Sequence, residues 1–338
     1  MRPSETNGGG RLILALGHTF PDLSIEQKVL EAIGARVVDG KGLQPASPVW
    51  ANVAGVLLGT GEHLCSAKLK AMPQCRAVVR YGIGYDNVDV AAAKELGIVV
   101  GIVRDYCIDE VAEHTIACAL TLSRDLVAWD RNMRAGKWRT GIPPRMQRVS
   151  RLCFALIGFG LIGRAVARRA RALFGRVAVF DPWAASAPES FAQDVEFVAS
   201  LDELLSTADV LSVHVPLNHE TRGLIGDIAL RRLKPSAIVI NASRGGIVDE
   251  TALLDAIGRG ALRGAALDTF VKEPLPAGHP LVNEPRVLLS PHIAWLSDES
   301  LIALRQRASE EMCLALEKRP LSSPVLLESE CPPISSRP

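Results

Sequence analysis

LCFALIGFGLIGRAVARRARALFGRVAVFD, residues 152–181, is the stretch that decides the fold of this chain. An apolar run leads into a glycine-rich sequence at residues 158–163, a helical pattern follows, and a second apolar run ends at Asp181. This order predicts a strand, a tight turn, a helix, a second strand and an acid about twenty residues beyond the glycines. It is typical of a dinucleotide-binding βαβ unit.

Each part of the stretch has a physical role in holding a dinucleotide. Gly158 allows the tight turn, Gly160 lets the backbone approach a pyrophosphate, and Gly163 lets the helix pack on the strand. The free N–H groups at the start of the helix attract phosphate. Asp181 would accept hydrogen bonds from ribose hydroxyls and repel a 2′-phosphate, which favours NAD over NADP. The expected cofactor-binding residues here are Gly158, Gly160, Leu161, Ile162, Gly163 and Asp181. A strand-to-helix turn that binds nothing is the alternative interpretation.

Composition bounds the class of protein. The chain has 338 residues, which favours two domains, and a net charge of +1, which gives no electrostatic argument for binding nucleic acid or a membrane. The seven cysteines include no CxxC pair. We therefore expect reduced thiols, a cytoplasmic protein and no structural metal.

Apolar strand-like runs alternate with helical patterns along nearly the whole chain, which predicts a parallel α/β architecture. Strands are expected at residues 12–16, 54–58, 77–79 and 98–103 in the first half, and at 153–157, 177–180, 210–215, 237–241, 264–267 and 287–289 in the second. One long helix is expected from residue 110 to about 134, and a last helix over 298–318. If that last helix returns to the first domain, that domain is discontinuous. The predicted fold is two doubly wound domains with a cleft between them.

Three charged residues follow strands of the second half. Arg244 lies in NASRGG, Glu273 in ALDTFVKEP and His292 in SPHIAW. Because ligands bind at the carboxyl ends of strands in open α/β sheets, all three can face one site. Histidine can exchange a proton near neutral pH, a carboxylate orients it, and arginine binds a carboxylate or polarises a carbonyl. A structural Arg–Glu ion pair is the alternative. The other histidines, including His114, are interpreted as structural or surface groups.

With these motifs together, the chain resembles the D-isomer-specific 2-hydroxyacid dehydrogenase family, in the branch of phosphoglycerate dehydrogenases and C-terminal-binding-protein corepressors. The resemblance covers residues 11–321. The motifs that carry it are RYGIGYDNVD at 80–89, VAEHT at 111–115, the glycine loop, NASRGGIVD at 241–249, ALDTFVKEP at 266–274 and SPHIAW at 290–295.

The resemblance implies NAD(H)-dependent interconversion of a 2-oxo acid and a D-2-hydroxy acid. Arg244 would bind substrate, His292 would be the acid/base, and Glu273 would support His292. It further implies a Rossmann NAD domain over 105–292, a flavodoxin-like substrate domain over 1–104 and 293–330, and a flexible tail over 331–338. The implied substrate-binding backbone is Tyr81, Gly82, Ile83 and Gly84. The further implied cofactor contacts are His214, Val215, Pro216, Thr221, Ala242, Ser243 and Asp268. A homodimer through residues 110–148 is also implied.

Two residues narrow the expected class of substrate. Trp295 would line one side of the substrate pocket and favour an apolar or planar substituent. Arg104 stands where the corepressor-like branch usually has proline, so it is a candidate ligand for a second acidic group; a solvated surface arginine is the alternative. An NADH-sensing corepressor-like binding protein with weak activity is the second functional hypothesis. A formate dehydrogenase is disfavoured because its relatives would carry glutamine at the position of Glu273.

Overall fold

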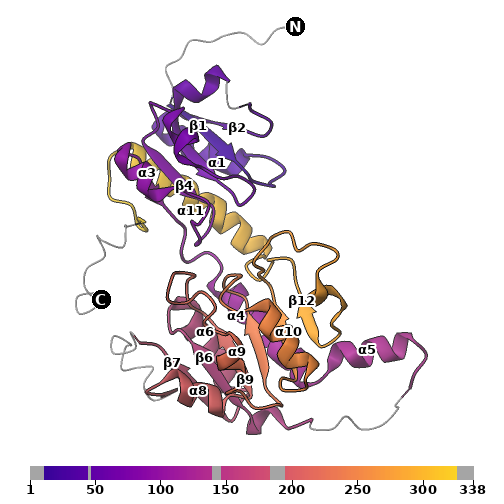
Figure 1. The fold of residues 1–338 in the computed structure, drawn as a ribbon. Helices are drawn as coiled ribbons and strands as arrows, with labels where there is room; N and C mark the ends of the chain where they lie inside the picture. The colour runs from indigo at the N-terminus through magenta and orange to yellow at the C-terminus, as the bar shows by residue number, and fades with distance from the viewer. Residues whose placement is uncertain (1–10, 45–46, 139–145, 183–194, 326–338) are drawn as a thin grey trace. The chain divides into compact units, whose positions relative to one another are not determined.

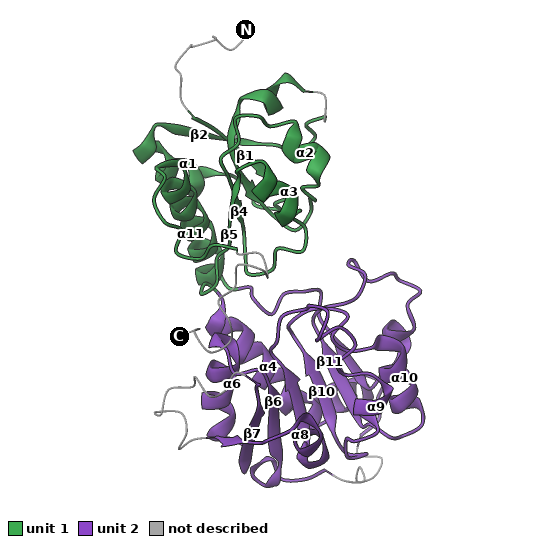
Figure 2. Ribbon diagram, turned by 60° about the vertical axis from the view of Figure 1, so that its left-hand side comes forward, with its two compact units in different colours: residues 1–106, 297–336 green, residues 107–296, 337–338 purple. Residues whose placement is uncertain are grey.

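The computed structural model describes residues 11–44, 47–138, 146–182 and 195–325. The chain forms two compact units, which Figure 2 distinguishes by colour. Of the described residues, unit 1 contains those from 11 to 106 and from 297 to 325, and unit 2 contains those from 107 to 296. The fold class predicted from the sequence, two parallel-sheet α/β domains, is confirmed.

Unit 1 is built on a five-stranded parallel sheet with the order β2-β1-β3-β4-β5. Its strands are β1 Arg11–Leu16, β2 Ala35–Asp39, β3 Val53–Leu58, β4 Ala77–Arg80 and β5 Val99–Gly101. Its helices are α1 Ser24–Leu30, α2 Ser66–Lys70, α3 Val90–Glu95 and α11 Asp298–Leu316. The strand order is that of flavodoxin-like sheets, in which helices cover both faces of a buried parallel sheet.

Helix α11 returns to unit 1 after the whole of unit 2 and packs against α1 (Figure 1). Arg305 of α11 binds the fully buried Glu26 of α1 through two hydrogen bonds of 2.8 and 2.7 Å. Without α11, this carboxylate would remain buried with no cation, which is costly. Unit 1 is therefore built from two separate stretches of the chain, and a buried ion pair joins α11 to α1.

Unit 2 is built on a seven-stranded parallel sheet with the order β12-β11-β10-β9-β6-β7-β8. Its strands are β6 Cys153–Ile157, β7 Arg176–Phe180, β8 Glu196–Phe197, β9 Val210–Val213, β10 Ile238–Asn241, β11 Gly264–Leu267 and β12 Val287–Leu289. Its helices are α4 Ile108–Ser123, α5 Leu126–Arg134, α6 Leu161–Arg171, α8 Leu201–Thr207, α9 Asp227–Leu230 and α10 Glu250–Gly258. The chain order reverses between β6 and β9, the switch point at which such sheets bind dinucleotides.

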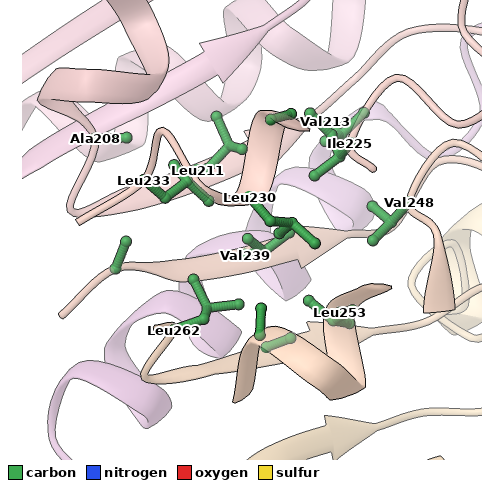
Figure 3. Close-up of a cluster of buried hydrophobic side chains, with 14 of the residues drawn as sticks. Ala208, Leu211, Val213, Ile225, Leu230, Leu233, Val239, Val248, Leu253 and Leu262 are labelled. Atoms are coloured by element: carbon green, nitrogen blue, oxygen red, sulfur yellow. The ribbon is translucent and has the colours of Figure 1, made fainter. Parts of the chain in front are cut away.

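Both faces of this sheet are buried. Along β6, Ala155 and Ile157 belong to one apolar cluster, whereas Phe154 and Leu156 belong to the cluster on the other face. Figure 3 shows the first cluster, in which Val239 lies among side chains from neighbouring helices and loops. Side chains alternate between faces along a strand, so a strand covered on both sides is apolar throughout. This explains why the sequence shows uninterrupted apolar runs.

The single helix expected over residues 110–134 is wrong. Helix α4 ends at Ser123 and α5 starts at Leu126, with Asp125 between them at a φ of 52°. Aspartate tolerates this left-handed conformation better than most residues do. The carboxylate of Asp125 lies 3.0 Å from Arg263, so a residue far along the chain stabilises the break. The predicted tail at 331–338 lies outside the described residues.

Candidate active site

The glycine loop joins β6 to α6. Gly158 has a φ of 94°, and a Cβ atom there would lie 2.5 Å from the carbonyl oxygen of His214. A Cβ at Gly163 would lie 2.3 Å from the carbonyl oxygen of Gly158. Both positions are therefore closed to side chains by backbone on the neighbouring strand or turn. At Gly160, a Cβ would meet no atom within 4 Å, so this position borders open space.

The start of α6 suits a pyrophosphate. Gly160 is the N-cap of this helix and, as a glycine, has no side chain that could cap it. The uncapped N–H groups of the first turn and the positive end of the helix dipole favour an anion. Open space at Gly160 fits a dinucleotide, as do the N–H groups of Leu161 and Ile162, which make no hydrogen bond to the described part of the chain.

Asp181 follows β7 and lies beside the same loop. Its Oδ2 accepts a hydrogen bond of 2.6 Å from the N–H of Phe159. This bond fixes the carboxylate next to the glycine turn, where ribose hydroxyls are bound in dinucleotide folds. The position fits a nicotinamide dinucleotide with a free ribose hydroxyl.

The loop after β9 carries the residues expected near the adenosine. His214 is half-buried, and its Nε2 lies 2.8 Å from Ser212 Oγ. Burial lowers the pKa of His214 to about 4, so its ring is neutral at physiological pH. The Thr221 hydroxyl donates to the carbonyl of Pro216 at 2.6 Å and closes this loop on itself. Val215 packs partly into the core of unit 2.

Three neighbouring strands position the charged residues. Arg244 follows β10, Glu273 follows β11 and His292 follows β12. His292 Nδ1 lies 2.7 Å from Glu273 Oε2, and Arg244 is close enough for its charge to act on Glu273. The structure therefore brings together the three side chains that the sequence singled out. Ser243, next to Arg244, donates to the carbonyl of Val213 at 2.6 Å and ties this loop and the neighbouring Ala242 to β9.

Glu273 is ionised at neutral pH. Partial burial raises its pKa, but hydrogen bonds from His292 and the Phe270 N–H, with the charges of His292 and Arg244, outweigh burial and hold the pKa below its usual value. A carboxylate in this state stabilises a protonated imidazole. The arrangement can hold a proton at His292 and present a guanidinium beside it.

The backbone of His292 is held by hydrogen bonds within its own loop and to the loop after β11. Its φ of 54° is unusual for a residue other than glycine. The His292 N–H donates to the Asp268 carbonyl at 2.8 Å, and the Trp295 indole N–H donates to the His292 carbonyl at 2.9 Å. Asp268 is buried, and its carboxylate accepts from the N–H groups of Ile293 and Ala294, each at 2.9 Å. The sequence predicts only a nicotinamide contact for Asp268. Its hydrogen bonds to residues 290–295, the loop that carries His292 and is called the histidine loop below, were not predicted.

In unit 1, the loop after β4 holds the residues expected to bind a carboxylate. The N–H of Tyr81 donates to Leu58, and that of Gly82 donates to the carbonyl of Arg80. The N–H groups of Ile83 and Gly84 make no hydrogen bond to the described part of the chain. The Tyr81 hydroxyl lies 3.1 Å from buried Glu26, which fixes the side chain at the start of the loop.

Arg104 is exposed and follows the buried Val103 in unit 1. Among the described residues, no group of three or more His, Cys, Asp or Glu side chains could hold a metal ion. None of the described helices combines the length and apolar content that a membrane crossing requires.

Comparisons with known proteins agree with this geometry. Residues 116–294 match the family model described as the D-isomer specific 2-hydroxyacid dehydrogenase NAD-binding domain. A glyoxylate reductase of Korarchaeum cryptofilum is 37% identical over 248 residues, which are 72% of this chain and 74% of the relative. A D-3-phosphoglycerate dehydrogenase of Mycobacterium bovis is 35% identical over 286 residues, 85% of this chain but only 53% of the relative.

Among solved structures, the 2-hydroxyacid dehydrogenase of Ketogulonicigenium vulgare superposes with a TM-score of 0.80 at 30% identity, covering 95% of this chain and 99% of that one. The family expected from the sequence motifs is thus confirmed. The chain belongs to the D-isomer specific 2-hydroxyacid dehydrogenase family and is a nicotinamide-dependent oxidoreductase.

Proposed function

We propose that the protein interconverts a 2-oxo acid and a D-2-hydroxy acid with NAD(H), using His292 as the acid/base. The observation that carries this proposal is the 2.7 Å contact of His292 Nδ1 with Glu273, beside Arg244. When bound, the reduced nicotinamide supplies a hydride to the carbonyl carbon. The reduction then needs one proton at the carbonyl oxygen, and a histidine held by a carboxylate can donate it.

The three residues have distinct roles in this proposal. Because Nδ1 of His292 faces Glu273, Nε2 is the atom left to exchange a proton with substrate. Arg244 binds the 2-oxo acid and stabilises the negative charge that develops on its carbonyl oxygen. In the oxidising direction, His292 takes the proton back from the hydroxyl group.

Backbone donors and one aromatic side chain are the further proposed substrate contacts. The N–H groups of Ile83 and Gly84 are the proposed donors to the substrate carboxylate, since those of Tyr81 and Gly82 are engaged within the fold. Trp295 is proposed to border the substituent at the 2-oxo carbon. Its indole N–H is bound to the His292 carbonyl, which fixes the plane of the ring.

The proposal is tested by following NADH and NADPH absorbance with a panel of 2-oxo acids. The panel contains glyoxylate, hydroxypyruvate, bulky hydrophobic 2-oxo acids and acids that carry a phosphate or phosphonate. We expect turnover with at least one member and a preference for NADH, because Asp181 would repel a 2′-phosphate. Tight NADH binding without turnover on any member would contradict the proposal and favour the NADH-sensing alternative.

Replacing Glu273 with glutamine is expected to move the pH dependence of reduction. In the native protein, the low pKa of Glu273 keeps its charge, and its stabilisation of protonated His292, until the pH falls below the usual carboxyl range. Glutamine removes this charge and with it the attraction for an imidazolium. The limb of the profile on which kcat declines with rising pH should therefore move toward acid.

This shift is measured from complete pH–rate profiles. Glu284→Gln is the matched control, because that carboxylate pairs with Arg286 outside the proposed catalytic group. If Glu273→Gln lowers kcat at every pH without moving either limb of the profile, Glu273 is not the carboxylate partner of His292.

Arg104 is proposed as a ligand for a second acidic group on the substrate. We expect Arg104→Ala to raise KM for 2-oxo acids with a second phosphate or carboxylate by about tenfold or more, and to leave KM for glyoxylate unchanged. Initial rates on matched mono- and di-acids measure this difference. If Arg104→Ala changes KM equally for mono-acids and di-acids, Arg104 is a surface residue that binds no second acidic group.

A homodimer is proposed to form through residues 110–148. Helix α5 extends away from the sheet of unit 2 (Figure 1), and none of its residues is buried. Leu126, Met133 and Trp138 are 54%, 52% and 77% exposed, and these apolar side chains are the ones that the proposed partner would cover. Residues 139–145 lie outside the described part of the chain.

The double variant Met133→Glu, Trp138→Glu is expected to have the mass of a monomer by light scattering, where the native protein has that of a dimer. Charges placed in an apolar interface are costly to bury. Ile228→Glu is the matched control, because Ile228 is 76% exposed and belongs to α9, outside residues 110–148. A dimer that persists in the double variant would place the interface elsewhere.

A further inference from the structure

We propose that His114 and Ser290 are positioning residues for the proton transfer assigned to His292, so this inference rests on the proposed function. They form a chain with Asp268 inside unit 2. His114 Nε2 lies 3.2 Å from Ser290 Oγ, which in turn lies 2.6 Å from Asp268 Oδ1. His114 is on α4, whereas Ser290 and Asp268 follow β12 and β11. None of these three residues belongs to the proposed catalytic group of Arg244, Glu273 and His292.

The number of hydrogen atoms available fixes the direction of donation along the hydrogen bonds from His114 through Ser290 to Asp268. The Ser290 hydroxyl has one hydrogen, and the short contact with the Asp268 carboxylate uses it. The Ser290 oxygen can then only accept from His114, so Nε2 of His114 carries a proton. Donation therefore runs from His114 to Ser290 and from Ser290 to Asp268.

Asp268 connects these hydrogen bonds to the histidine loop. Its Oδ1 also accepts from the Ile293 N–H and its Oδ2 from the Ala294 N–H, while its carbonyl accepts from the His292 N–H. The side chain is 2% exposed, so each donor that it loses leaves buried negative charge less well satisfied. Ser290 supplies one of the two donors to Oδ1.

The histidine loop needs such support. His292 has a positive φ, a conformation that costs energy in a residue other than glycine and persists only where surrounding bonds hold it. Its ring must also remain 2.7 Å from Glu273. When Ser290 or His114 is removed, the carboxylate of Asp268 can turn, the bonds to residues 293 and 294 weaken, and the ring of His292 loses its alignment.

The experiment compares Ser290→Ala and His114→Ala with two conservative variants. Ser290→Thr keeps a hydroxyl, and His114→Gln keeps a terminal N–H donor near the position of Nε2. We expect each alanine variant to lower kcat about tenfold, because a misplacement of about 1 Å caused by a substitution far from the chemistry can cost about 100-fold. The conservative variants should recover most of kcat. Ser123→Ala, which removes a buried hydroxyl from the same helix, is the matched control and should behave as the native protein does.

A second readout does not depend on turnover. Amide hydrogen exchange at Ile293 and Ala294, measured without NADH, should be faster in both alanine variants and close to native in Ser290→Thr and His114→Gln. Native exchange at these amides in both alanine variants overturns the proposal, as does equal loss of kcat in alanine and conservative variants. If the native protein turns over no 2-oxo acid, the proposed function fails, and amide exchange still decides the positioning role. If one alanine variant does not fold, the other and its conservative partner decide.

Discussion

Replacing His292 with alanine is expected to lower kcat about a thousandfold while leaving the dissociation constant of NADH nearly unchanged, because general acid–base catalysis contributes 10²- to 10⁴-fold. The hydride would still be available, but no side chain could give the proton to the carbonyl oxygen. Steady-state reduction with the best 2-oxo acid gives kcat, and quenching of protein fluorescence gives NADH binding.

The positive φ of His292 requires a second variant. Alanine is strained in the left-handed region, whereas asparagine adopts it more readily. His292→Asn therefore keeps the loop and removes the proton donor, and it should be as inactive as His292→Ala. An active His292→Asn enzyme would show that the alanine variant fails through its backbone. His63→Ala, at an exposed histidine of unit 1, should retain native kcat.

The central part of the fold was predictable because it rests on local patterns. An apolar run predicted β6, the glycines marked the turn, and Asp181 closed the βαβ unit at a fixed distance. The candidate catalytic residues were predictable for a related reason. Each follows a strand of one parallel sheet, and the carboxyl ends of such strands meet at one edge.

The features that the sequence did not reveal depend on bonds between distant residues. The break at Asp125 is stabilised by Arg263, and nothing in the helical pattern of residues 110–134 indicates that ion pair. The Asp268 carboxylate accepts hydrogen bonds from residues that lie 22 to 26 positions further along the sequence, namely Ser290, Ile293 and Ala294. A single buried acid that binds hydroxyl and amide donors leaves no periodicity, so only the structure shows it.

Replacing Arg244 with glutamine is expected to lower kcat/KM about a thousandfold, at the upper end of the 10²- to 10³-fold loss typical when one donor to a developing oxyanion is removed. In the proposed mechanism, Arg244 binds the 2-oxo acid and meets the charge that forms on its carbonyl oxygen. Both kcat and the apparent affinity for substrate should therefore fall. NADH binding should not change.

Arg244→Lys separates charge from geometry. Lysine restores a positive charge but lacks the planar fork that binds a carboxylate and a carbonyl together, so it should recover only part of kcat/KM. Because Arg244 also lowers the pKa of Glu273, the lysine variant should keep the native pH profile more closely than Arg244→Gln does. Arg231→Gln, which breaks an exposed pair with Asp227, is the control for loss of a surface arginine. If Arg244→Gln lost only thermal stability and kept kcat/KM, the guanidinium would be a structural partner of Glu273, and the charge on the carbonyl oxygen would have to be met by another group.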